Sequence, residues 1–324
     1  MAIRDIPGQP AAKALLRHAL RTGKVAHAYL FAGPPGTGRR AMALAFAQAL
    51  FCEKGEDDAC GECLACRKVQ SGNHPDLRVI APEGASLKLG QILGLQREMS
   101  YRSMESARKA AILERAETMT PEAANSLLKF LEEPPPGLTA ILIAPGPKAL
   151  PPTVVSRMQV VPFSPADPAE LEEALAAEGH PRMLARLAAH LAPGLDGCRE
   201  LLSDKGFAEL RNLVIQLGEE SVSRLPDALL AVHRAFRTDL AGRAELLLGM
   251  LALWYRDIVL AGAGRGDRLV FADQARRIAE LARRRGAGEW IRAAEQALAA
   301  VRRIRANVSP QLALEHFLIS TREG

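Results

Sequence analysis

Residues 27–50, HAYLFAGPPGTGRRAMALAFAQAL, join a short apolar run to a glycine-rich loop and then to a helical pattern. The run at 28–32 predicts a strand, and residues 39–50 predict a helix. A strand, a glycine loop and a helix in this order are the setting of a phosphate-binding loop, the P-loop. The stretch therefore predicts the beginning of an α/β domain.

The P-loop pattern, G-x-x-x-x-G-K-[ST], is only partly kept. Gly33, Gly36 and Gly38 preserve the frame in which backbone N–H groups close on phosphates, but Arg39 and Arg40 replace the Lys and the Mg²⁺-binding hydroxyl. The helix N-terminus would still attract an anion, and Arg39 could pair with a phosphate, although Arg is not equivalent to Lys in a tight loop. The simplest alternative is a tight turn that only enters a helix. We expect ATP binding here to be weakened at the least.

Four further apolar runs, at 77–81, 110–114, 139–144 and 158–162, are continuous and not alternating. Continuous runs are typical of strands buried on both faces, so we predict a parallel sheet covered by helices. Between the second and third runs, residues 120–137 read TPEAANSLLKFLEEPPPG. They predict one amphipathic helix, with Thr120 as its N-cap and three prolines ending it.

The composition is that of a globular protein with two or three domains. Of 324 residues, 48% are hydrophobic and 24% charged, while aromatic residues make up only 4%. Few aromatics beside abundant Ala, Leu and Arg favour helix over an all-β architecture. The sequence shows no signal-peptide pattern and no run of about 18 apolar residues, so we expect a cytoplasmic protein with no membrane partner.

After FSPADP, residues 163–168, the strand signals stop and helical patterns continue to the end. Residues 169–205 hold short helices, separated by Gly179, Pro181 and the turn-like APGLDG at 192–197, and longer patterns follow. We therefore predict an α/β domain over 1–165, a small helical domain over 166–206 and a helical C-terminal domain over 207–324.

Four of the five cysteines lie close together in FCEKGEDDACGECLACRK, residues 51–68. Cys52, Cys60, Cys63 and Cys66 have the spacing C-x7-C-x2-C-x2-C. Four thiolates so placed complete the closed shell of a structural zinc site. A disulfide is the alternative, but cytosolic chains are usually kept reduced. We predict zinc at these four residues and read Cys198 as a small buried side chain.

A P-loop ATPase also needs two carboxylates after a later strand, one for Mg²⁺ and one to activate water. In AAILERAETMT, residues 110–120, Glu114 occupies the first position and Arg115 the second. Since Arg cannot act as the base, we predict no ATP hydrolysis at this site. Arg157 precedes the last predicted strand. It is either a salt-bridge residue or an arginine offered to a neighbour's ATP site, and spacing alone does not separate the two.

The net charge of +5 is concentrated near the C-terminus. Residues 261–305 contain eleven Arg, no Lys and five Asp or Glu, which gives this segment a charge of +6. Such a segment is either a surface that faces phosphates or a partner, or the solvated side of Arg-rich helices. We favour the second interpretation because the arginines are spread over several predicted helices.

Several motifs together resemble one known family. They are GQP at 8–10, HAYLFAGPPGTG at 27–38, the four-cysteine insertion after the P-loop helix, AANSLLKFLEEPPP at 123–136, TVVSR at 153–157, LWYRDIVL at 253–260 and NVSPQLALEHFL at 307–318. The chain resembles the delta-prime family of bacterial DNA polymerase III clamp-loader subunits, which is of the AAA+ class. The match extends over nearly the whole chain.

The resemblance implies an AAA+ ATPase-like domain over 1–165 with a zinc-binding insertion at 52–66, a helical lid over 166–206 and a collar over 207–324. It implies a non-catalytic subunit that joins gamma/tau and delta subunits in a ring of five. The ring, part of the DNA polymerase III holoenzyme, would load the sliding clamp on primer-template DNA during replication.

The resemblance also implies roles for two arginines. Arg157 matches the Arg of the family's SRC motif, an arginine finger for the ATP site of the adjacent gamma/tau subunit, although Met158 stands where the family has Cys. Arg199, in GLDGCRELL, is the nearest match to the second sensor Arg, but its register is off by one. Because of this shift in register, the sequence does not support a lid that closes on a nucleotide.

Two other functions remain as alternatives. An active gamma/tau-type ATPase would share the fold, the cysteine insertion and the SRC-like Arg, but Arg39, Arg40 and Arg115 speak against it. A zinc-containing DNA-binding module would use the basic segment 261–305 and would bind DNA in a strongly salt-dependent way.

Overall fold

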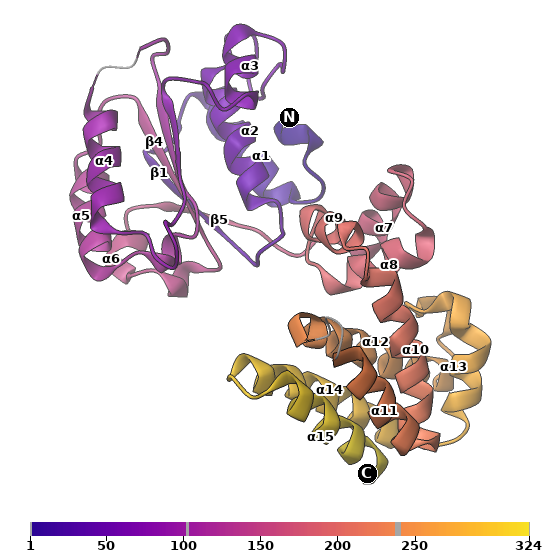
Figure 1. Ribbon diagram of the computed structural model, residues 1–324. Helices are drawn as coiled ribbons and strands as arrows, with labels where there is room; N and C mark the ends of the chain where they lie inside the picture. Colours follow the sequence, from indigo (N-terminus) through magenta and orange to yellow (C-terminus); the bar gives the residue numbers. More distant parts are fainter. Residues whose placement is uncertain (1, 102–103, 237–240, 324) are drawn as a thin grey trace. The chain divides into compact units, whose positions relative to one another are not determined.

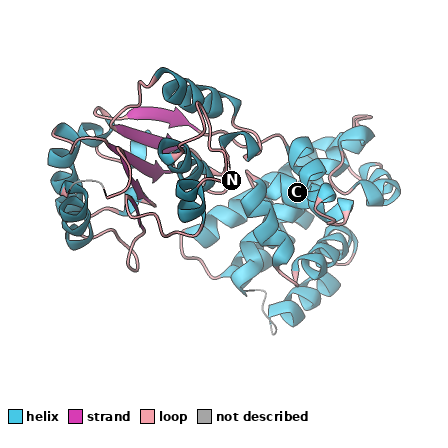
Figure 2. Ribbon diagram, turned by 90° about the horizontal axis from the view of Figure 1, so that it is seen from above, coloured by secondary structure: helices cyan, strands magenta, loops and turns pink. Residues whose placement is uncertain are grey.

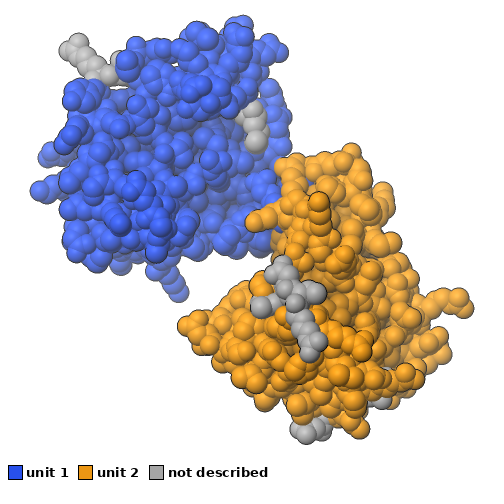
Figure 3. All heavy atoms as spheres, viewed as in Figure 1, with its two compact units in different colours: residues 1–170, 193–197 blue, residues 171–192, 198–324 orange. Residues whose placement is uncertain are grey.

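The computed structural model describes residues 2–101, 104–236 and 241–323 and divides into two compact units (Figure 3). The α/β unit comprises residues 1–170 and 193–197, and the helical unit comprises 171–192 and 198–324. The separation of a lid (166–206) from a collar (207–324) stays a prediction. None of the helices within the described ranges is long and apolar enough to cross a membrane.

The α/β unit contains a five-stranded sheet with the order β2-β3-β4-β1-β5, in which every pairing is parallel. The strands are β1 (Ala28–Ala32), β2 (Leu77–Ile80), β3 (Lys109–Leu113), β4 (Leu138–Ala144) and β5 (Gln159–Pro162). The three central strands β1, β3 and β4 are buried along their whole length. The predicted parallel sheet is confirmed, and each strand lies within one residue of its predicted bounds.

Helices cover both faces of this sheet (Figures 1 and 2). One face carries α1 (Pro10–Thr22), α2 (Arg39–Phe51) and α3 (Leu64–Gln70); the other carries α4 (Leu89–Ser100), α5 (Pro121–Glu132) and α6 (Pro152–Val155). Alternate residues of β1 point into the two cores, Tyr29 and Phe31 into the first and Leu30 into the second. This is the two-sided burial that a continuous apolar strand requires.

The predicted helix after β3 is α5. Its N-cap is Thr120, whose hydroxyl accepts the N–H of Ala123 at 3.3 Å, and Pro121 occupies the first turn. Leu127 and Leu131 are buried against the sheet. The helix ends at Glu132, and only Glu133 separates it from the first of the three prolines, Pro134.

The helical unit contains long packed helices around a core that includes Trp254, Tyr255, Trp290 and Phe317. α7 (Pro168–Ala177) starts at the end of the α/β unit. α9 (Leu195–Ser203) begins with residues of the α/β unit and continues in the helical unit. The others are α8 (Arg182–Leu191), α10 (Phe207–Ser223), α11 (Leu225–Phe236), α12 (Ala244–Gly262), α13 (Ala275–Ala282), α14 (Ala287–Arg305) and α15 (Pro310–Glu323).

The turn predicted at 192–197 is too long. Only its first part is a turn, because α9 already begins at Leu195. Asp196 lies in the first turn of that helix, where a carboxylate favours the positive end of the helix dipole. The carboxylate of Asp196 and the burial of Cys198 favour a helix here more strongly than the two glycines favour a turn.

Gly33, directly after β1, allows two backbone segments to approach each other closely. A Cβ at this position would lie 2.3 Å from the carbonyl oxygen of Phe163, which follows β5. Because Phe163 also donates its N–H to Ala32 at 2.7 Å, its backbone cannot move away at low cost. We expect Gly33→Ala to lower the stability of the α/β unit by about 2–3 kcal/mol.

Urea unfolding of the full chain measures this effect. Gly90→Ala is the matched control, since a Cβ at this residue of α4 meets no atom within 4 Å. Alanine in a helix should raise stability there by up to about 1 kcal/mol. Equal unfolding midpoints for the two variants would contradict the close approach.

Candidate functional site

The P-loop connects β1 to α2, as the sequence predicts. Gly36 and Gly38 have φ angles of 83° and 79°, in the left-handed region that favours glycine. The hydroxyl of buried Thr37 donates to a carbonyl of the same loop at 2.9 Å. The Arg39 guanidinium donates to the carbonyl of Ala144 at the end of β4, and burial lowers the pKa of Arg39. The cation at the lysine position is therefore bound to the protein's own backbone.

Arg40 and Glu114 stand at the two positions that would ligate Mg²⁺, and they form an ion pair. The Arg40 Nε lies 2.5 Å from Oε1 of Glu114. In an active site the hydroxyl and the carboxylate at these positions both serve the metal. Here the carboxylate is neutralised by a guanidinium, which cannot ligate a cation. Arg115, at the position of the water-activating acid, is exposed.

Gln9 and Gly194 contact the P-loop from other parts of the α/β unit. A Cβ at Gly194 would lie 2.0 Å from the carbonyl oxygen of Gly36, so the two backbones touch directly. Gln9 is buried, and its side-chain amide donates to the carbonyls of Thr37 at 3.3 Å and Ser164 at 2.6 Å. It also accepts the N–H of Ser164 at 3.1 Å. Gln9 thus connects the P-loop to the segment that follows β5.

Arg157 lies between α6 and β5 with its side chain 35% exposed. One terminal nitrogen of its guanidinium lies 2.5 Å from Oε1 of Glu132, at the end of α5, and the other donates to the carbonyl of Thr153 at 2.7 Å. Because a guanidinium has five N–H donors, further donors remain at the exposed edge. The ion pair is thus observed, and the guanidinium is held where it can still meet an anion.

The four predicted zinc ligands converge. The Sγ atoms of Cys52, Cys60, Cys63 and Cys66 all lie within 4.8 Å of one another. The N–H of Cys60 donates to the sulfur of Cys52 at 3.3 Å, and the N–H groups of Cys63 and Cys66 donate to the preceding ligand sulfur at 3.4 Å. Backbone N–H groups of Glu62 and Cys63 lower the pKa of the Cys60 thiol to about 6. All five cysteines are free, so the disulfide alternative is not realised.

The surroundings of these sulfurs fit a structural metal ion. Gln48 of α2 is 2% exposed, and its side-chain nitrogen has no hydrogen-bond partner within the described residues. Burial raises the pKa of the Cys66 thiol to about 12, whereas the Gln48 side chain acts in the opposite direction. A buried donor beside a thiol suits a metal-bound thiolate, which accepts hydrogen bonds from its surroundings. Four sulfurs fill a tetrahedral shell and leave no position for catalysis.

Two further predicted features lie in the helical unit. Arg199 of α9 pairs with Glu178 at 2.5 Å, and its role as a sensor stays a prediction. In the basic segment, ion pairs join Arg277 to Glu219, Arg285 to Glu289 and Arg305 to Glu245. These pairs agree with the solvated-helix interpretation of that segment.

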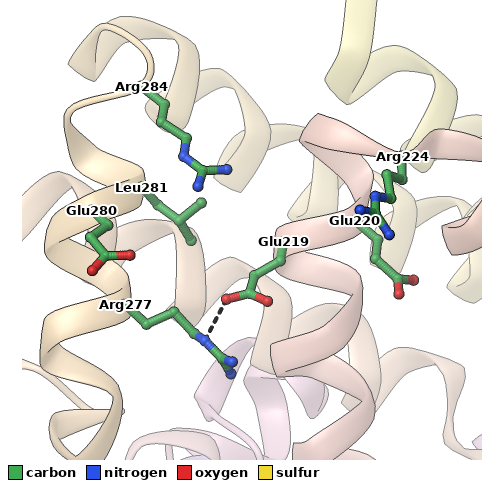
Figure 4. Close-up of a pocket in the computed structure, with 7 residues that line it drawn as sticks. All are labelled: Glu219, Glu220, Arg224, Arg277, Glu280, Leu281 and Arg284. Carbon is green, nitrogen blue, oxygen red and sulfur yellow. Dashed lines mark ion pairs between the residues drawn. The ribbon is translucent and has the colours of Figure 1, made fainter.

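A cavity of about 290 Å³ in the helical unit carries mixed charge (Figure 4). One side is formed by Glu219, Glu220 and Arg224 at the end of α10, and the other by Arg277, Glu280, Leu281 and Arg284 on and after α13. With three acidic and three basic side chains, and Arg277 paired to Glu219 at 2.6 Å, the cavity shows no preference for a charged ligand.

Sequence reasoning missed three side chains that position these groups: Gln9, Gln48 and Glu132. Gln9 stands in the quoted motif GQP and Glu132 in LEEPPP, so each lay in a segment already singled out. Gln48 gave no such signal, because a polar residue in a helix is usually exposed.

Two protein-family models match the chain. Residues 8–167 match "DNA polymerase III, delta subunit", and residues 207–323 match "DNA polymerase III, delta subunit, C terminal". The DNA polymerase III subunit delta' of Bacillus subtilis is 36% identical over 318 residues, 98% of this chain and 97% of that protein. The delta' subunit of Pseudomonas aeruginosa is 40% identical over 173 residues, 48% of this chain and 53% of that protein. A solved structure of a DNA polymerase III gamma subunit-related protein from Thermotoga maritima covers 96% of this chain and 99% of its own, with a TM-score of 0.47 and 19% identity.

Proposed function

The chain belongs to the DNA polymerase III delta-prime family, and from this premise we propose how it acts in the clamp loader. It is a non-catalytic subunit of that complex. It assembles with gamma/tau and delta subunits in the cytoplasm, and through them it acts on the sliding clamp and primer-template DNA. Its own P-loop serves the fold, and ATP is hydrolysed by its neighbours.

The ion pair between Arg40 and Glu114 carries this proposal. The two residues at the Mg²⁺-binding positions pair with each other, with 2.5 Å between the Arg40 Nε and the Glu114 Oε1. Arg39, at the position of the phosphate-binding Lys, also has a partner within the chain, because its guanidinium donates to the carbonyl of Ala144. Phosphoryl transfer depends on a metal ion, a phosphate-binding cation and a group that orients water. In this chain the metal position holds the Arg40–Glu114 ion pair. The phosphate-binding position holds Arg39, and the water-orienting position holds Arg115.

Reconstitution tests the assembly role. The purified chain is mixed with delta and gamma/tau subunits, and the mass of the product and its ATP hydrolysis are measured. We expect one defined complex that contains this chain and hydrolyses ATP at the gamma/tau sites. Failure to enter any complex with these subunits would contradict the proposal.

Arg157 is the residue that we propose acts on another subunit's ATP. Its position before β5, its partial exposure and its remaining N–H donors support an arginine finger. The contacts to Glu132 and Thr153 hold the guanidinium without burying it. A preset side chain loses less conformational entropy when it meets the phosphate.

Glu132→Gln should weaken this placement. Exposed ion pairs contribute about 0.2–1 kcal/mol, so we expect ATP hydrolysis at the adjacent gamma/tau site to slow about two- to fivefold. The measurement is the single-turnover rate of that site in the assembled complex with primed DNA, with assembly checked by mass. Glu133→Gln is the matched control, because it removes the same charge one residue further on and should leave the rate unchanged. A rate that rises in Glu132→Gln would mean that the ion pair restrains Arg157.

We also propose a structural zinc ion at Cys52, Cys60, Cys63 and Cys66. The mutual sulfur distances, the N–H donors on three sulfurs and the unpartnered Gln48 amide support it. Zinc in such a shell stabilises a fold and performs no chemistry. These cysteines would hold it directly after α2, at the end of the P-loop helix.

A further inference from the structure

The cysteine loop, residues 52–66, contains a buried carboxylate that none of the roles above uses. Asp58 is 6% exposed and is not one of the four sulfur ligands. Its Oδ1 accepts the N–H of Ile3 at 2.8 Å and that of Ala59 at 2.8 Å, and its Oδ2 accepts the N–H of Arg4 at 3.1 Å. Removing a carboxylate from water costs free energy, so a buried carboxylate needs several hydrogen bonds to stabilise it. Two of its three donors belong to the first residues of the chain.

The cysteine loop is shaped to bring Asp58 to that position. Cys52 and Cys60, two of the converging ligands, lie on either side of Asp58 in the sequence. At Gly55 the loop turns so tightly that a Cβ would lie 1.8 Å from the carbonyl oxygen of Asp58 and 3.3 Å from the Cys52 sulfur. The position of Asp58 therefore depends on how the ends of this loop are joined.

The N-terminal segment, residues 2–9, extends from Asp58 to the P-loop. Ile3 and Ile6 are buried in the same core as Cys63 and Cys66. A Cβ at Gly38 of the P-loop would be in van der Waals contact with Ile6, at 3.5 Å. The segment ends in Gln9, whose side chain holds the P-loop and the segment after β5.

Gln9 needs support from its neighbours because its backbone is strained. Its φ of 58° is in the left-handed region, which a residue with a side chain adopts only when the surroundings fix it. Immediately before it, Gly8 has a φ of 64°. Two consecutive residues in this region make a sharp turn, and Asp58 fixes the chain on its other side.

We propose that the cysteine loop is a clamp for the N-terminal segment, in which Asp58 fixes residues 3 and 4 and thereby sets Gln9 against the P-loop. Asp58 is a positioning residue. The inference rests on the proposed metal in one respect: joining Cys52 to Cys60 through a shared ion closes the loop around Asp58 and reduces its conformational freedom. Loss of the ion should therefore release the N-terminus as well as loosen the loop.

Amide hydrogen exchange in the full-length chain tests the clamp, resolved to single residues by fragmentation of the intact protein. In Asp58→Ala we expect the amides of Ile3 and Arg4 to exchange on the order of tenfold faster or more, because each loses a hydrogen bond to a charged group. Asp58→Asn, which keeps one acceptor, provides a milder variant if Asp58→Ala folds poorly. Asp57→Asn is the matched control, since Asp57 pairs with Arg17 on α1 and not with the N-terminal segment. Asp57→Asn should change the exchange rates of the Ile3 and Arg4 amides less than twofold.

Chelation tests the link to the ion. Zinc per chain is measured by native mass spectrometry in the same samples. Removing zinc from the wild type should accelerate the same two amides, and removing it from Asp58→Ala should add little, because the contact is already lost. Unchanged exchange in both Asp58 variants would overturn the clamp. Zinc loss that leaves Ile3 and Arg4 protected would overturn the link. A wild type that binds no zinc would contradict the metal site, while the comparison of Asp58 with Asp57 still decides the clamp.

Discussion

Arg157→Ala should lower ATP hydrolysis at the adjacent gamma/tau site by about a thousandfold or more, with assembly intact. An arginine finger stabilises the charge that builds up on the transferring phosphoryl group, and its loss costs about 10³ to 10⁵ in kcat. In a single-turnover experiment with the assembled complex, the rapid phase should lose the amplitude of one ATP site. The other sites keep their own arginines and should continue.

Two variants make this experiment specific. Arg157→Lys keeps the positive charge but not the planar fork of donors, so it should recover only a small part of the rate. Arg39→Ala removes an arginine of the degenerate P-loop, which points to the backbone of the same chain, and should leave hydrolysis by the complex unchanged. A full rapid phase from an assembled Arg157→Ala complex would contradict the finger.

Cys63→Ser should remove the metal and strongly destabilise the α/β unit. Structural zinc contributes about 10–16 kcal/mol to the folding of zinc-finger peptides. The cysteine loop also packs on an apolar core through Cys63 and Cys66, so part of its order should persist without the ion. We expect zinc to fall from one per chain to none, and the unfolding free energy of the unit to fall by at least about 3 kcal/mol.

Native mass spectrometry and thermal unfolding measure the two effects of Cys63→Ser together. Cys198→Ala is the control, because Cys198 is buried in the helical unit and lies outside the four-cysteine cluster. It should cost packing energy but keep one zinc ion. A wild type without zinc, or a Cys63→Ser protein as stable as the wild type, would contradict a structural metal.

The sheet and the cysteine cluster could be predicted because their signals are local. A strand buried on both faces must be apolar throughout, and this marks 28–32 or 139–144 without knowledge of their partners. Ligands two residues apart can share a metal whatever surrounds them. The arginines at 39, 40 and 115 were informative because a P-loop ATPase specifies the residue type at each of those positions.

The features that could not be predicted depend on contacts between residues far apart in the sequence. Arg40 and Glu114 are 74 residues apart, and their ion pair forms only when β1 and β3 lie in the same sheet. Gln9 meets Ser164 across 155 residues. Asp58 stands among several acidic residues, and the sequence cannot distinguish the buried one from its exposed neighbours. The start of α9 at Leu195 was missed because glycine and proline nearby indicate a turn with equal strength.

ATP turnover by the purified chain tests the central claim, that this subunit's own nucleotide site is inactive. With Mg²⁺ and primed DNA present, we predict phosphate release no faster than in a blank without protein. Arg39→Ala should give the same value. Turnover by the wild-type chain that Arg39→Ala abolishes would contradict the claim, and the chain would then be an active ATPase of the gamma/tau type.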